Sequence, residues 1–239
     1  MNFKRSTMSL FVLAGFLFLT MPVMAQKTSP VFRWENFGTA NGMPDEKVLC
    51  VAVDGDNVWA GTENGLVLVN KGRIQKIYKT EDGLVNRMVT GVAVDHETGD
   101  VWLATFGGLS RLSGGQFKNY TNLTSGLAND IVYGVGIQGE FVWAATTAGI
   151  SRFNTRTGEW TIFSEKNTPL HEPWSYGIAV SEKKVYVAVW GGGLLEYDIA
   201  EATGNHTTIL TARWKLCCSK TRGCYTTSSA TSPITPIRK

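Results

Sequence analysis

A repeat of 41 to 43 residues constrains this chain more than any other feature of its sequence. Three tryptophans, Trp59, Trp102 and Trp143, recur in the same local context, and Tyr186 takes the same place in a weaker fourth copy. Successive positions in this series are 43, 41 and 43 residues apart. A fixed period of this length indicates an architecture in which each repeat is one supersecondary unit that buries its apolar face against its neighbours.

Each repeat contains four short segments that read as strands. A small, apolar segment comes first, and a polar turn separates it from the segment that carries the tryptophan. A threonine and then a glycine mark the next turn, a Gly-Leu or Gly-Ile segment follows, and a segment ending in an aromatic residue closes the repeat. The residues that we assign to this structural register are Trp59, Thr62, Gly65, Trp102, Thr105, Gly108, Trp143, Thr146, Gly149 and Tyr186.

Short turns of this kind join antiparallel neighbours. Four antiparallel strands repeated about every 40 to 45 residues are typical of a propeller blade, and the α-solenoid alternative lacks the i, i+3, i+4, i+7 apolar spacing. We therefore predict an all-β fold, a partial β-propeller of four-stranded antiparallel blades with about four blades visible. The repeats cover 26–204: a lone outer strand at 32–37, then blades at about 45–80, 86–121, 129–164 and 172–204, the last with only three of its strands.

The repeat resembles the two-component regulator propeller repeat family. In the first copy the resemblance depends on Asp54, Trp59, Thr62, Gly65, Leu66 and Tyr78, and over all copies it covers residues 32 to about 203. It implies an extracytoplasmic propeller, often the sensing region of a longer signalling protein that continues into a membrane span and a histidine kinase. The family supplies no fixed catalytic residues.

The first 25 residues are predicted to be a secretory signal peptide. Lys4 and Arg5 precede an apolar run from Met8 to Leu19, and Ala25 ends a cleavage site of small residues. A membrane anchor is the alternative, but the run is shorter than the roughly 20 residues that a span needs. We expect cleavage after Ala25, a periplasmic or secreted protein, and no membrane span after signal removal.

Charge and residue usage argue against several classes of function. The net charge is +3, yet residues 26–204 carry 15 Lys and Arg against 20 Asp and Glu, which gives no reason to expect a nucleic-acid partner. Cys50 stands alone in the repeats, so no disulfide framework is expected. The chain has three histidines and no GxSxG, HExxH or phosphate-loop motif. We predict no catalytic residues, no metal and no cofactor.

Residues 205–239 share nothing with the repeats. They contain six basic residues, no acidic residue and three of the four cysteines, Cys217, Cys218 and Cys224. We interpret them as an aberrant basic tail that is either out of frame from about Gly204 or disordered. Read one nucleotide earlier, this stretch permits a peptide that parallels residues 81–100, so the parent protein would be longer. A metal site at the three cysteines is the alternative, although a tail that is out of frame gives them no designed role.

Strands that alternate in direction place the turns after the tryptophan strands and the connectors between repeats on one face. Loops from several blades converge there, and exposed aromatic rings beside amide and acid groups suit a small molecule, a glycan or a protein. Ordinary solvated loops are the alternative. The candidate ligand-binding residues are Glu63, Asn64, Arg87, Phe106, Asp130, His171, Trp174 and Trp190. Trp174 and Trp190 are the strongest, because neither has an aromatic counterpart in every blade.

The sequence therefore favours an extracytoplasmic ligand-binding or sensing module, which the family resemblance connects with two-component signalling. Two alternatives stay open. One is a propeller-type lyase or hydrolase that acts on a polysaccharide or small molecule, and the other is a scaffold for protein–protein interaction.

Overall fold

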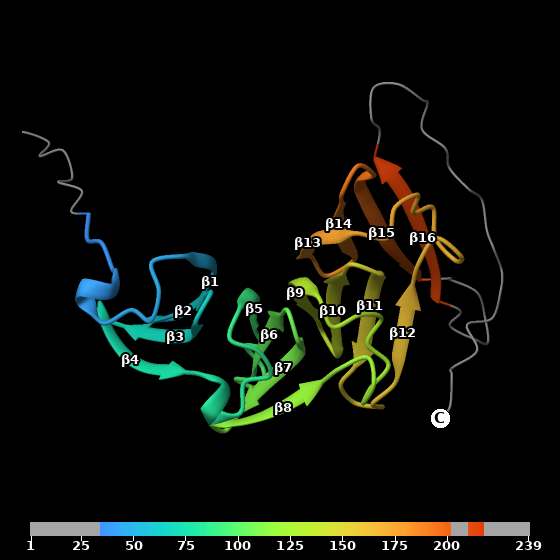
Figure 1. Cartoon of the computed structure of the whole chain (residues 1–239). Coiled ribbons are helices and arrows are strands. Elements are labelled where there is room, and N and C mark those ends of the chain that lie inside the picture. The colour runs from blue at the N-terminus through green and yellow to red at the C-terminus, as the bar shows by residue number, and fades with distance from the viewer. Residues whose placement is uncertain (1–33, 202–209, 218–239) are drawn as a thin grey trace, which may run out of the picture. The chain divides into compact units, whose positions relative to one another are not determined.

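Four separate four-stranded sheets make up the part of the protein that the computed structural model describes, residues 34–201 and 210–217, with side chains through 198 (Figure 1). The first sheet contains β1 (Val48–Asp54), β2 (Asn57–Thr62), β3 (Gly65–Asn70) and β4 (Arg73–Tyr78). The second contains β5 (Val89–Val94), β6 (Val101–Thr105), β7 (Gly108–Ser113) and β8 (Gln116–Tyr120). The third contains β9 (Val132–Gln138), β10 (Phe141–Thr146), β11 (Gly149–Asn154) and β12 (Trp160–Phe163). The fourth contains β13 (Ser175–Val180), β14 (Lys184–Val189), β15 (Gly193–Glu201) and β16 (Leu210–Cys217).

Within each sheet the strands follow one another in chain order, and every pairing is antiparallel. Two short 3₁₀ turns, Thr39–Asn41 and Thr80–Asp82, precede the first and second sheets. The predicted all-β fold of four-stranded antiparallel units is thereby confirmed. No helix among the described residues is long and apolar enough to cross a bilayer. The predicted signal peptide lies outside them.

Two details of the predicted organisation differ from the structure. The described part of the predicted lone outer strand, residues 34–37, forms no strand, because no neighbouring strand offers it hydrogen bonds there. The sequence predicts no regular structure for the tail, but residues 210–217 pair along β15 from Glu201↔Leu210 to Leu194↔Cys217 and complete the fourth sheet. This stretch does alternate apolar and polar residues, as a strand with one buried face requires. The remainder of the tail lies outside the described residues.

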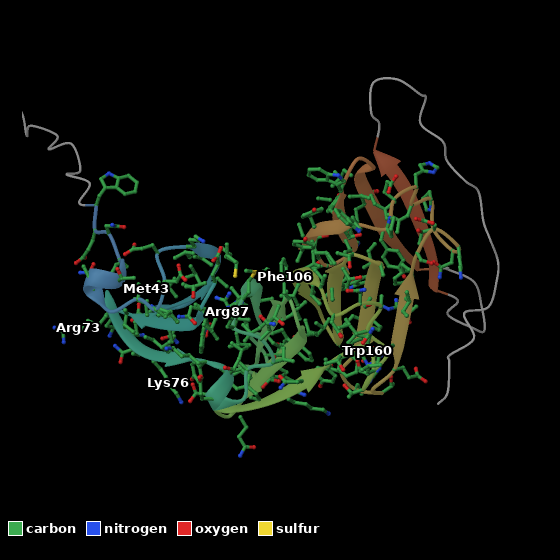
Figure 2. The ribbon with its side chains drawn as sticks, in the orientation of Figure 1. Met43, Arg73, Lys76, Arg87, Phe106 and Trp160 are labelled. Carbon is green, nitrogen blue, oxygen red and sulfur yellow. The ribbon has the colours of Figure 1, made fainter. Side chains whose placement is uncertain are left out.

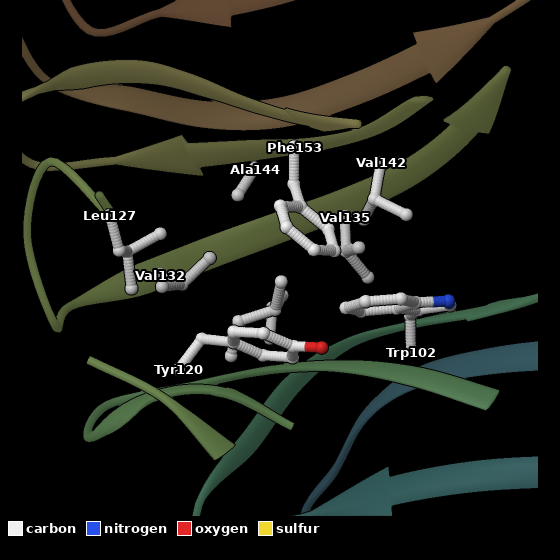
Figure 3. Close-up of a cluster of buried hydrophobic side chains, with 10 residues drawn as sticks. Trp102, Tyr120, Leu127, Val132, Val135, Val142, Ala144 and Phe153 are labelled. Atoms are coloured by element: carbon white, nitrogen blue, oxygen red, sulfur yellow. The ribbon is translucent and has the colours of Figure 1, made fainter. Parts of the chain in front are cut away.

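The core consists of seams between successive sheets. In the seam between the second and third sheets, Trp102 and Tyr120 pack against Val132, Val135 and Phe153 (Figure 3). Trp59 and Trp143 occupy the same place in the seams on either side. Trp102 and Trp143 are 1% and 0% exposed. The first strands of the four sheets, β1, β5, β9 and β13, contact one another in succession, and we call them the inner strands. Each tryptophan therefore holds its own sheet against the inner strand of the next one, where hydrophobic burial of a large ring stabilises the stack.

The repeated threonine and glycine build the turn after each tryptophan strand. The hydroxyl of Thr105, which is fully buried, donates to the carbonyl of Gly108 at 2.7 Å and accepts the backbone N–H of Gly107 at 3.0 Å. Thr62 and Thr146 make the same pair of bonds in the neighbouring sheets. Gly108 has φ +124°, which favours glycine. A threonine–glycine pair thus closes the turn and satisfies its polar groups internally.

Candidate functional site

Four aromatic side chains form a row that crosses the second, third and fourth sheets. Phe106 lies in the turn after β6, where Figure 2 labels it, and its ring meets Tyr133 edge-on with centroids 5.2 Å apart. Tyr133 packs against Tyr176 at 4.3 Å, and Tyr176 packs against Trp190 at 5.4 Å. We call these four residues the aromatic row. It joins two turn residues to two residues of the inner strands.

The register of the inner strands explains why the two tyrosines meet. Tyr133 follows the first residue of β9, and Tyr176 follows the first residue of β13, so they occupy equivalent positions one repeat apart. Each tyrosine is the extra residue of a β-bulge, because the residues on either side of it pair with consecutive residues of the neighbouring strand. The strands themselves approach closely, because Gly134 presents no side chain to the backbone of Tyr176.

The row changes from half-buried to exposed as it crosses the sheets. Phe106, Tyr133 and Tyr176 are half-buried, whereas Trp190 is 64% exposed and the nearby Trp174 is 46% exposed. The N–H of Trp190 donates to the carbonyl of Trp174 at 2.8 Å, which fixes the two tryptophan backbones beside each other. Burial raises the pKa of the Tyr133 hydroxyl, and a hydrogen bond with Tyr176 raises it further, so this hydroxyl stays neutral at physiological pH.

Three of the predicted ligand-binding residues make contacts within the first sheet and its connectors. Lys47 forms an ion pair with Glu63 at 2.9 Å, and Arg87 donates to the backbone carbonyl of Glu63 at 3.0 Å. The side-chain amide of Asn64 donates to the carbonyl of Pro44 at 3.3 Å. These contacts brace the turn of the first sheet against the connectors on either side of that sheet.

The two remaining predicted residues lie in connectors between sheets. Asp130 accepts the backbone N–H of Asn122 at 2.7 Å, which orders the connector between the second and third sheets. His171 is exposed in the connector before the fourth sheet. Of the eight candidates, then, Phe106 and Trp190 belong to the aromatic row, and Trp174 adjoins it.

A hollow of about 330 Å³ lies on the outer side of the seam between the second and third sheets. Tyr120, Phe153 and Trp160 line it, with Trp160 labelled in Figure 2, and Lys118 stands at its edge. The three rings pack on one another with centroids 4.7 to 5.8 Å apart. None of the predicted ligand-binding residues reaches it. We regard this hollow as the open margin of a packing seam.

Among the side chains that the structure describes, no three His, Cys, Asp or Glu residues come together as a metal ion would require. Cys50 is free, and burial raises its pKa to about 11, so its thiol is protonated and unreactive at neutral pH. The aromatic row itself offers flat apolar rings and phenol hydroxyls, which suit binding by stacking and hydrogen bonding.

The fold is similar to that of solved bacterial extracellular domains. The extracellular domain of a hybrid two component system of B. thetaiotaomicron matches with a TM-score of 0.61 and 21% identity, over 69% of this chain and 25% of that one. The extracellular domain of a one component system of the same organism matches with a TM-score of 0.55 and 19% identity, over 67% and 25%. The WD40 β-propeller domain of Doa1 matches with a TM-score of 0.52 and 12% identity, over 67% and 51%.

The chain has a β-propeller fold. The similarity agrees with the resemblance of its repeats to two-component regulator propeller repeats. This chain spans about a quarter of the length of the two bacterial domains. No protein-family model matches the sequence, and neither does a curated protein.

Sequence reasoning missed Tyr133 and Tyr176, which join the turn residues into one row. The composition of the inner strands indicates small and apolar residues, and the two tyrosines depart from it. The available signal was the shared register: both tyrosines follow the first residue of an inner strand, at the position that Thr90 takes in the second sheet. Because the inner strands of the third and fourth sheets approach closely, aromatic residues at equivalent positions on them lie within stacking distance.

Proposed function

We propose that this protein is an extracytoplasmic ligand-recognition module that senses its ligand without converting it. The aromatic row with Trp174 carries the proposal, because it combines two exposed indole rings with half-buried tyrosines, one of which packs against Trp190. Rigid aromatic surfaces of this kind bind the apolar faces of sugar rings or the side chains of a peptide at low entropic cost. The similarity to extracellular domains of signalling proteins supports a sensing role.

The proposed location depends on the predicted signal peptide. We infer that the mature protein begins at Gln26 and is released to the periplasm or the exterior. N-terminal sequencing of the exported protein is expected to start at Gln26. A mature protein that retains Met1 would contradict this.

Binding is best tested with arrays of oligosaccharides and peptides, followed by calorimetry on the strongest probe. Trp190→Ala and Tyr176→Ala are expected to weaken that probe at least tenfold, because each removes a ring from the row. Trp34→Ala is the matched control: Trp34 is 93% exposed and distant in sequence from the row, so its loss should leave affinity unchanged. Unchanged affinity in both row variants would refute the assignment of the site.

The same probes separate the proposal from the two alternatives. A lyase or hydrolase would shorten the oligosaccharide during incubation, which mass spectrometry would detect as new products. A scaffold would bind proteins from an envelope extract while it ignored both arrays.

A further inference from the structure

The first and fourth sheets each expose apolar residues whose counterparts in the second and third sheets are buried in seams. On β1, Val51 and Val53 are 65% and 64% exposed, and we call these two residues the front face. Their counterparts on β9, Val135 and Ile137, belong to the seam in which Trp102 packs against the third sheet. The front face therefore has the composition of a seam, although none of the four described sheets lies in front of it.

The fourth sheet also exposes apolar residues, on its side away from the third sheet. Leu194 is 40% exposed, whereas its counterparts Leu66, Leu109 and Ile150 are fully buried. Ala188 is exposed, and its counterpart Ala145 is buried. With Tyr186, which takes the place of the seam tryptophans, these residues form what we call the back face: Tyr186, Ala188 and Leu194.

A glycine in the inner strand of the fourth sheet indicates that another backbone approaches there. A Cβ on Gly91 would lie 3.2 Å from Cα of Gly134, and a Cβ on Gly134 would lie 3.1 Å from the carbonyl oxygen of Tyr176. These glycines let each inner strand approach the next. Gly177 has the equivalent position, yet among the described residues a Cβ there would meet only Ala188 of its own sheet, at 3.7 Å. Glycine within a strand is destabilising unless a close approach uses the space.

We propose that the back face of one copy of this chain binds the front face of a second copy, head to tail. The interface would continue the seam that the chain already forms three times, with Tyr186 and Leu194 of one copy lying against Val51 and Val53 of the next. Front and back faces differ, so the contact is heterologous and either closes into a ring or extends. This inference does not depend on the proposed ligand site, because neither face contains a residue of the aromatic row.

Light scattering coupled to size exclusion tests the proposal on the chain without its predicted signal peptide. At about 100 μM, where contacts of micromolar affinity are populated, we expect a mass of two or more chains. V51E/V53E removes the front face and L194E removes the back face, and each variant alone should be monomeric. L123E is the matched control, since Leu123 is 87% exposed in a connector and belongs to neither face.

Mixing the two variants gives the decisive result. V51E/V53E keeps an intact back face and L194E keeps an intact front face, so together they should form a dimer that cannot grow. A monomeric unsubstituted chain would overturn the proposal. So would a failure of the mixture to associate, provided that circular dichroism shows both variants folded as the unsubstituted chain is.

Discussion

At the scale of single residues, the repeat is defined by side chains that form hydrogen bonds with the backbone of a turn. The buried Thr105 hydroxyl both donates and accepts within four residues, so Thr105→Val keeps the shape and removes both bonds. We expect the free energy of unfolding to fall by about 1–3 kcal/mol, because the half-buried N–H of Gly107 loses its acceptor and the buried carbonyl of Gly108 loses a donor. Urea unfolding measures this. Thr80→Val, at an exposed position, should change stability by less than about 0.5 kcal/mol, and an equal loss there would contradict the assigned role.

The turn glycines allow a matched comparison. Gly108 has φ +124° and lies against the backbone of Tyr120, whereas Gly114 has φ +56° and a Cβ added there would meet nothing within 4 Å. Gly108→Ala should therefore destabilise the protein by clearly more than the ~1 kcal/mol expected for Gly114→Ala. Thermal unfolding of the two variants tests this, and equal melting temperatures would refute the close approach.

Cys50 predicts a dependence on alkaline pH. Its folded pKa of about 11 lies above the ordinary value of 9.0, so folding favours the neutral thiol. The stability contributed by the neutral thiol is fully present below pH 9 and is lost as the pH rises through about 11. At pH 8 we expect native Cys50 to react with iodoacetamide about 100-fold more slowly than after unfolding, measured by peptide mapping. Equal rates would contradict its burial.

The register residues could be recognised from sequence because each repeats with the same spacing. The tyrosines of the aromatic row could not, since only two of the four inner strands carry an aromatic residue at that position. The ion pair between Glu63 and Lys47 could not be predicted from the sequence either. It joins residues that are 16 positions apart, across a turn whose geometry the sequence does not specify.

At the scale of the elements, stability is concentrated in the seams. Trp143 is fully buried between the third and fourth sheets, stacked on Phe163 with ring centroids 5.6 Å apart, whereas Tyr186 takes the same register on the back face. Trp143→Ala should cost about 3–5 kcal/mol in unfolding free energy. Tyr186→Ala should cost much less in dilute monomer, where no sheet covers it. Chemical denaturation at micromolar protein compares them, and equal losses would refute the assignment of the back face.

The strands themselves were largely predictable, and the exception has a simple cause. Strands β1 to β15 follow the apolar segments and turns of the repeats. β16 was missed because its composition differs from that of every other repeat, although its period-two alternation is present. Composition thus misled where periodicity was informative.

At the scale of the whole molecule, one inference supports everything else: the tryptophan–threonine–glycine register marks successive antiparallel sheets that stack through their inner strands. A crystal structure of the chain without its predicted signal peptide tests this most directly. We predict that Trp59, Trp102 and Trp143 each lie against the inner strand of the following sheet, at equivalent positions. Tryptophans in unrelated environments, or helices in place of the repeated strands, would contradict it.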